Sequence, residues 1–198
     1  MSRILRFYSA PLACAVVPQL GCGCLAKPVL IRLEGEAAVE RAWLHRSGEV
    51  IAVEWKRELD AGRQVDLLWA ALGGQSDEII PVPAAPVSEL LASFPDPACW
   101  YGRESVDHLS EEEAHTLAAR VVLRLSEAGV PLPEGAALQC DLACAFRDVL
   151  IDEEVVPIET RLDRLYVAAS TVLQQHVGAQ QERRWKVPLR ACMHLPTC

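Results

Sequence analysis

Two stretches of alternating apolar and polar residues follow one another in the first half of the chain. Residues 38–45 alternate, with Val39 and Trp43 on one side, and residues 49–55 alternate again. Residues 46–48, Arg-Ser-Gly, separate the two stretches and are typical of a turn. Two alternating runs around a glycine-containing turn predict a β-hairpin.

A helix is predicted on each side of this hairpin. Residues 28–33 are a short helix candidate, because proline suits the first helical turn and Gly35 follows where a C-terminal glycine belongs. After the hairpin, Asp60 can cap a helix over residues 63–72. Its apolar residues recur at helical spacing and define one face: Val65, Leu68, Trp69 and Leu72. We expect three tryptophans to share one core: Trp43, Trp55 and Trp69.

The other elements of the first half are short. Residues 15–18 predict a first strand, and residues 79–82 predict an edge strand, because Pro81 cannot donate a hydrogen bond to a neighbouring strand. The proline-rich residues 81–86 predict an extended connector. The order of elements is therefore βαββαβ.

The second half has mainly helical periodicity. Ser110 and the glutamates after it predict a helix start, and residues 138–151 and 158–177 predict two further helices. Residues 185–193 alternate as a strand would. We expect an α+β protein, with a ferredoxin-like βαββαβ domain over residues 1–84 and a mostly helical domain over residues 90–198.

Composition and charge exclude several classes of function. The chain is 51% hydrophobic and 23% charged, which is typical of a folded globular protein. Its net charge of −8 and the lack of a basic block argue against nucleic-acid binding. No apolar run approaches the ~20 residues that span a bilayer, and no glycine-rich nucleotide motif is present. The first residues resemble a signal peptide only weakly, so we expect a cytoplasmic protein, with export as the alternative.

The cysteines carry the main candidate chemistry. Cys22 and Cys24 are separated by one residue and flanked by Gly21 and Gly23. Thiolates this close suit Cu(I), Hg(II) or Zn(II), and the glycines are expected to bend the backbone so that both sulfurs face one ion. The alternative is that these cysteines are buried small hydrophobes.

Further candidate ligands lie in the second half. Cys140 and Cys144 are four residues apart and would share a helix face, although such a pair also occurs in core packing. Cys192, His194 and Cys198 at the C-terminus combine thiolates with an imidazole, the ligand types that zinc prefers.

Three segments resemble the heavy-metal-associated domain of copper chaperones and mercury-binding proteins: residues 15–22 its first strand and loop, residues 33–35 its leucine-x-glycine step, and residues 67–73 its second helix. The resemblance covers about residues 13–83. It implies a ferredoxin-like fold, Cys22 and Cys24 as metal ligands, and another metal-handling protein as a partner. The family has Cys-x-x-Cys where this chain has Cys-x-Cys, so Cys140, Cys144 or Cys192 is a candidate third ligand.

The leading functional hypothesis is binding of a thiophilic metal ion, namely copper, mercury or zinc, in resistance, trafficking or sensing. One alternative is a cysteine-dependent enzyme, either a thiol–disulfide oxidoreductase or a metal-dependent lyase. Another is a protein-interaction module whose cysteines are structural. The residues alone leave these three open.

Overall fold

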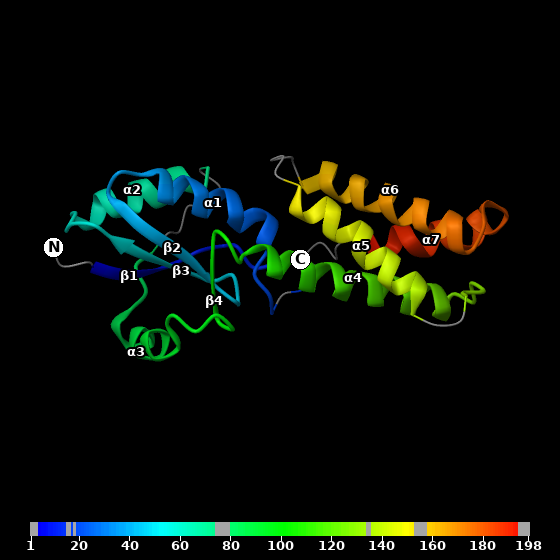
Figure 1. Ribbon diagram of the computed structural model, residues 1–198, viewed down its shortest axis with the longest axis horizontal. Coiled ribbons are helices and arrows are strands. Elements are labelled where there is room, and N and C mark those ends of the chain that lie inside the picture. The colour runs from blue at the N-terminus through cyan, green and yellow to red at the C-terminus, as the bar shows by residue number, and fades with distance from the viewer. Residues whose placement is uncertain are drawn as a thin grey trace. The chain divides into compact units, whose positions relative to one another are not determined.

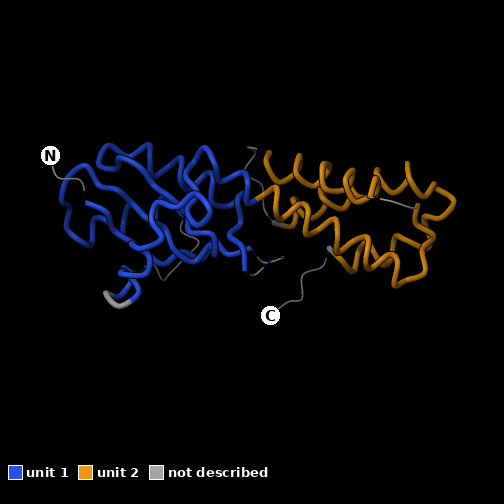
Figure 2. The backbone as a smooth tube through the Cα atoms, turned by 60° about the horizontal axis from the view of Figure 1, so that its bottom comes forward, with its two compact units in different colours: residues 1–109 blue, residues 110–198 orange. Residues whose placement is uncertain are grey.

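The computed structural model describes residues 4–14, 17, 19–73, 80–133, 136–152 and 158–193. The chain divides into two compact units, residues 1–109 and residues 110–198, which Figure 2 shows in different colours. The first unit is mixed α/β, and the second is helical (Figure 1).

The first unit is built on an antiparallel sheet in the order β1-β3-β2-β4. β3 lies between β1 and β2, and the β2–β3 hairpin is the one predicted from alternation. The strands are β1 (Ile4–Ser9), β2 (Val39–His45), β3 (Val50–Trp55) and β4 (Trp100–Gly102). The helices of this unit are α1 (Gly23–Gly35), α2 (Ala61–Ala71) and α3 (Ala84–Ser93).

The outer edge of β1 is only partly paired. Pro81 forms an isolated bridge with Tyr8. The Ser9 N–H donates to the Ile80 carbonyl at 2.9 Å, and the Val82 N–H donates to the Phe7 carbonyl at 3.0 Å. Residues 80–82 thus lie along β1 as a bridge, whereas β4, which was not predicted, extends the opposite edge beside β2. The mixed α/β class with an antiparallel sheet is confirmed, but the ferredoxin-like order is not.

Both faces of this sheet are covered, as Figure 1 shows, with α1 and α2 on one side and α3 on the other. Adjacent residues of β1 face the two cores. Tyr8 belongs to the main core, with α1 and α2, and Phe7 belongs to a smaller core, with Trp100 and α3. The Tyr8 hydroxyl donates to Gln64 Oε1 at 2.5 Å and accepts a hydrogen bond from Trp55 Nε1 at 3.2 Å. Burial raises the pKa of Tyr8 to about 12.

The expectation of one tryptophan core is wrong. Trp55 is fully buried in the main core, but Trp69 is 50% exposed on α2, where Leu67, Leu68 and Ala71 are the buried face. Trp43 packs on the opposite side of the sheet, with its ring 5.0 Å from that of Phe94. The reason is a register shift between Val39 and Arg41, which turns Val39 and Trp43 to opposite faces.

Helix starts and the first strand also differ from the sequence predictions. The first strand is β1, not residues 15–18, of which only Val17 is described. α1 begins at Gly23, because the Cys22 carbonyl accepts the Ala26 N–H at 3.0 Å, and Pro28 lies inside it. Asp60 caps α2 as predicted, its side chain accepting the Arg63 N–H at 2.9 Å. The predicted extended connector is partly α3, since its first turn tolerates proline at position 86.

The described part of the second unit consists of helices: α4 (Asp107–Glu127), which starts just before the unit boundary, α5 (Ala137–Ile151), α6 (Ile158–His176), the short 3₁₀ helix η1 (Ala179–Gln181) and α7 (Glu182–Met193). α5 and α6 are as predicted, whereas α4 begins three residues before Ser110, which is fully buried. The strand predicted over residues 185–193 is wrong. Trp185 and Leu189 are buried four residues apart, while Val187 is 72% exposed, so the alternating pattern lies on a helix.

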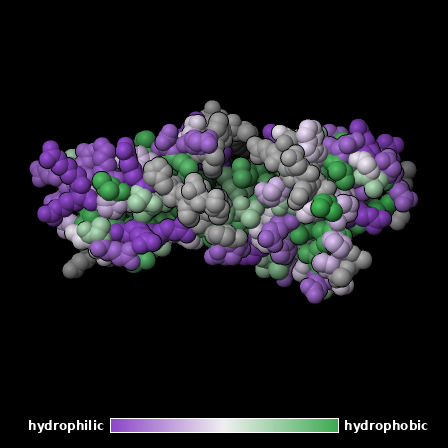
Figure 3. All heavy atoms as spheres, turned by 180° about the vertical axis from the view of Figure 1, so that it is seen from behind, coloured by the Kyte–Doolittle hydropathy of each residue, from purple (hydrophilic) through white to green (hydrophobic). Residues whose placement is uncertain are grey.

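On the face drawn in Figure 3, hydrophilic residues are interspersed with smaller apolar areas. No described helix has both the length and the apolar character needed to cross a bilayer.

Candidate functional site

Cys22 and Cys24 meet at the start of α1. Cys22 is the N-cap, with extended backbone angles (φ −84°, ψ 104°), and Cys24 is the second residue of the helix. The two Sγ atoms are 3.0 Å apart, and neither cysteine is in a disulfide. The change from extended to helical backbone at Gly23 therefore places the two sulfurs next to each other.

The loop before α1 is a small hairpin of its own. Ala13 forms a bridge with Gly21, the Cys22 N–H donates to the Leu12 carbonyl at 2.7 Å, and the Cys14 N–H donates to the Leu20 carbonyl at 2.7 Å. We define residues 12–22 as the cysteine loop. Its backbone pairing fixes where Cys22 enters the helix.

The cysteine loop docks on the turn between β2 and β3. The Leu12 N–H donates to the Gly48 carbonyl at 2.9 Å, and the Gly21 N–H donates to the Arg46 carbonyl at 2.6 Å. A Cβ on Gly21 would lie 2.9 Å from Leu44 Cδ2, and a Cβ on Gly48 would lie 2.4 Å from the Leu12 carbonyl oxygen. Gly21 is thus needed for close approach to the hairpin, and not, as predicted, for bending the chain around an ion.

Two features of the setting act in opposite directions on negative charge at sulfur: burial disfavours the thiolate, and a helix start favours it. Cys22 is 6% exposed and Cys24 is half-buried. The N-terminal end of a helix carries partial positive charge from its unpaired N–H groups, which stabilises a nearby thiolate. No acidic residue lies in the first turn of α1 to oppose this effect.

The separation of the two sulfurs is shorter than a bound thiophilic ion would require. Zn–S bonds of about 2.3 Å place two thiolates of a tetrahedral site about 3.8 Å apart, and a linear two-thiolate site with bonds of that length places them about 4.6 Å apart. The observed separation is 3.0 Å, so the sulfurs would have to move apart to hold an ion.

No larger donor cluster surrounds the pair in the part of the chain that the structure describes. Within the described residues, no three His, Cys, Asp or Glu side chains lie together as a metal site would require. The addition of Cys140, Cys144 or Cys192 as a third ligand therefore stays a prediction.

Cys14 is a neighbour that the sequence analysis did not treat as a candidate. It lies on the same face of the cysteine loop as Leu12, Leu20 and Cys22, and all four are buried. Its Sγ accepts the Val17 N–H at 3.3 Å. Its position next to the pair depends on the backbone pairing of the cysteine loop, for which the sequence gives no periodic signal.

The second cysteine pair has a different setting. Cys140 and Cys144 lie one helical turn apart in the middle of α5 and both are exposed, so the alternative that they pack in the core is wrong. Next to Cys140, Asp141 forms a contact of 2.7 Å between its Oδ2 and Nε2 of His176 on α6.

Only part of the C-terminal candidate set is described. Cys192 lies near the end of α7 and is half-buried. Burial raises the pKa of its thiol, and the charges of Arg124 and Arg120 partly oppose this. His194 and Cys198 lie outside the described residues.

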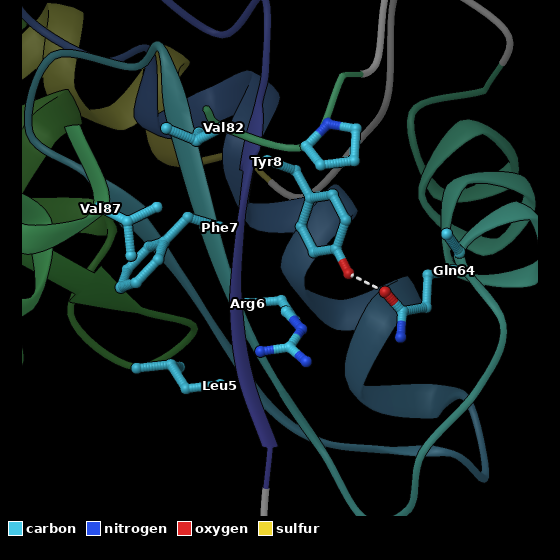
Figure 4. Close-up of a pocket in the computed structure, with 9 residues that line it drawn as sticks. Leu5, Arg6, Phe7, Tyr8, Gln64, Val82 and Val87 are labelled. Carbon is cyan, nitrogen blue, oxygen red and sulfur yellow. Dashed lines mark hydrogen bonds between the residues drawn. The ribbon is translucent and has the colours of Figure 1, made fainter. Parts of the chain in front are cut away.

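A cavity of about 230 Å³ lies at the edge of β1, away from the thiols. Figure 4 shows Arg6, Tyr8 and Gln64 on one side of the strand and Leu5, Phe7 and Val87 on the other. The Tyr8 hydroxyl points to Gln64 and is already bonded to it. No cysteine lines this cavity, so it is not part of the thiol site.

Comparison of the chain with protein-family models, with curated proteins and with solved structures finds no match.

Proposed function

We propose that this protein binds a soft metal ion, Cu(I) or Hg(II) in preference to Zn(II), through the thiolates of Cys22 and Cys24. The observation that carries the proposal is the 3.0 Å separation of two reduced thiols at the start of a helix. Two thiolates satisfy an ion that accepts two soft ligands, whereas a structural zinc site needs four ligands. The metal is cargo in this proposal, consistent with a role in resistance, trafficking or sensing.

The family resemblance over residues 13–83 belongs to the same proposal. Three features of the first unit support the resemblance. β3 lies between β1 and β2, two helices cover one face of the sheet, and residues 80–82 form a bridge along β1. We propose that these elements correspond to the ferredoxin-like order, with β4 as an addition beside β2. A partner protein that exchanges the metal would approach Cys24, which is the more exposed of the two thiols.

The test is a competition for Cu(I) against a chromophoric chelator under reducing conditions. We expect the double variant Cys22→Ser/Cys24→Ser to lose at least about 100-fold in affinity, which corresponds to about 2.7 kcal/mol. The matched control is Cys140→Ser/Cys144→Ser, for which we expect the tight site to change by less than about threefold. Equal affinities of the wild type and the Cys22→Ser/Cys24→Ser variant would reject the proposal.

A further inference from the structure

We propose that Cys22 and Cys24 also form a dithiol–disulfide couple that exchanges with small disulfides, with Cys24 as the attacking thiol and Cys22 as the resolving thiol. The inference concerns the same pair as the metal proposal but does not depend on metal binding. It goes beyond that proposal by assigning a reaction and a distinct role to each sulfur.

The backbone between the two cysteines permits a disulfide. Gly23 is helical, and helix geometry places Cα atoms two residues apart at a distance of about 5.4 Å. Disulfides span Cα distances of about 4.4–6.8 Å with an S–S bond of about 2.05 Å. The sulfurs, at 3.0 Å, therefore need to close by about 1 Å, which side-chain rotation supplies.

The two thiols differ in access. Cys24 is half-buried in the first turn of α1, whereas Cys22 is only 6% exposed. An incoming disulfide therefore reaches Cys24 first. The same N-terminal end of α1 stabilises the Cys24 thiolate, which is the nucleophile in this chemistry.

The reaction proceeds in two balanced steps with a low-molecular-weight disulfide, RSSR. The Cys24 thiolate attacks one sulfur of RSSR, a Cys24–SR bond forms, and RS⁻ leaves. Cys22 then loses its proton and attacks the Cys24 sulfur, so that the Cys22–Cys24 bond forms and the second RS⁻ leaves. The protein loses two electrons and two protons, and RSSR becomes two RSH.

The pair on α5 provides an internal contrast. Cβ atoms of residues four apart on a helix are about 5–6 Å apart, beyond the about 3.5–4.5 Å that a disulfide requires. Cys140 and Cys144 are exposed, so they can form mixed disulfides but cannot bond to each other while α5 is intact.

The experiment uses the full reduced chain in EDTA with oxidised glutathione, followed by alkylation and peptide mapping. Trypsin separates the groups, because residues 7–32 contain Cys14, Cys22 and Cys24 and residues 125–147 contain Cys140 and Cys144. We expect the first peptide to lose two hydrogens through a Cys22–Cys24 bond and the second to gain glutathione on each cysteine.

Single variants test the assigned roles. Cys22→Ser should trap a stable mixed disulfide on Cys24, whereas in Cys24→Ser the remaining Cys22 should react about tenfold more slowly. Persistent mixed disulfides on both cysteines of the wild type, a Cys14–Cys22 bond, or faster trapping at Cys22 than at Cys24 would overturn the proposal. The peptide map of the wild-type protein tests the disulfide proposal even if a variant fails to fold. Because the experiment contains no metal, rejection of the disulfide proposal would not reject the metal-binding proposal.

Discussion

Cys22 and Cys24 lie at the start of a helix against the core of the first unit, whereas Cys140 and Cys144 lie in the middle of a helix on an exposed face of the second. The first pair is held by a loop that is itself hydrogen-bonded to the β2–β3 turn. The second pair is held only by the regular turn of α5. Both pairs place two thiols within reach of one ion, so spacing alone does not separate their chemistry.

Their surroundings do separate it. A helix start stabilises a thiolate and an extended N-cap lets sulfurs two residues apart meet. In a helix interior, neither effect is present, and the side chains stay about 5–6 Å apart at Cβ. The comparison teaches that a cysteine pair gains reactivity from the backbone that presents it, and the predictions below test this dependence.

The largest expected effect is in the core that supports the first pair. Trp55→Ala removes a fully buried ring and should lower the free energy of unfolding by about 3–5 kcal/mol, measured from the urea midpoint. Because Cys22 belongs to the same core cluster as Trp55, the labelling rate of Cys22 by a maleimide should rise, while that of Cys140 and Cys144 should not.

The control for this substitution is Trp69→Ala. Trp69 is 50% exposed, so we expect a loss of less than about 1 kcal/mol and no change in thiol labelling. A similar midpoint for both variants would show that the core is not centred on Trp55.

The next effect concerns the docking of the cysteine loop. Gly48 and Gly129 both have positive φ, 76° and 70°, but a Cβ on Gly48 would press on Leu12 and Ala13 while a Cβ on Gly129 would meet nothing within 4 Å. Gly129→Ala should cost about 1–2 kcal/mol from backbone strain alone, and Gly48→Ala should cost at least about 3 kcal/mol.

A second readout distinguishes loop docking from stability alone. Gly48→Ala should also weaken Cu(I) binding at the first pair. The added Cβ would displace the cysteine loop, and Cys22 is the last residue of that loop and the N-cap of α1. Gly129→Ala should leave binding unchanged. If the two variants bound Cu(I) equally well, the docking of the loop on the β2–β3 turn would be irrelevant to the site.

A smaller effect depends on pH and on the first unit only. The pKa of Tyr8 is raised from 10.0 to about 12 by burial, so the native state binds the phenolic proton more tightly than the unfolded state does. The resulting stability is fully present below pH 10 and is lost as the pH rises through 12, by up to about 3 kcal/mol. Tyr8→Phe removes this dependence, so the stability difference between wild type and variant should shrink over that range. A constant difference, measured by urea unfolding at each pH, would contradict the burial of this hydroxyl.

The sequence predicted the elements that keep a clear periodic pattern. α2, α5 and α6 have helical periodicity because each buries one face, and β2 and β3 keep enough alternation to be recognised although both faces of the sheet are covered. The existence of these five elements was correctly predicted. β1 buries Phe7 on one face of the sheet and Tyr8 on the other, which removes the alternation that identifies a strand. The register shift near Val39 places Trp43 on the face of the sheet opposite to the predicted one. Such a shift arises from the pairing of β2 with β3, which the local sequence does not reveal.

As with the fold, only part of the candidate site could be predicted from the sequence. The proximity of Cys22 and Cys24 follows from their separation by one residue. The position of Cys14 depends on the reversal of the cysteine loop, and the roles of Gly21 and Gly48 depend on contacts between residues far apart in the chain. Such non-local contacts leave no periodic pattern in one sequence.

The smallest effect compares the two pairs directly through serine substitution in the reduced, metal-free protein. Cys22 is buried in the main core, so Cys22→Ser places a hydroxyl in an apolar setting and should cost about 1–3 kcal/mol. Cys140→Ser and Cys144→Ser change exposed side chains and should each shift stability by less than about 0.5 kcal/mol.

The measurement is the urea midpoint of each single variant, with Cys24→Ser expected between the two groups because Cys24 is half-buried. If Cys22→Ser were as mild as the α5 variants, the buried setting of the first pair would be wrong, and with it the reason for assigning Cys22 the protected, resolving role.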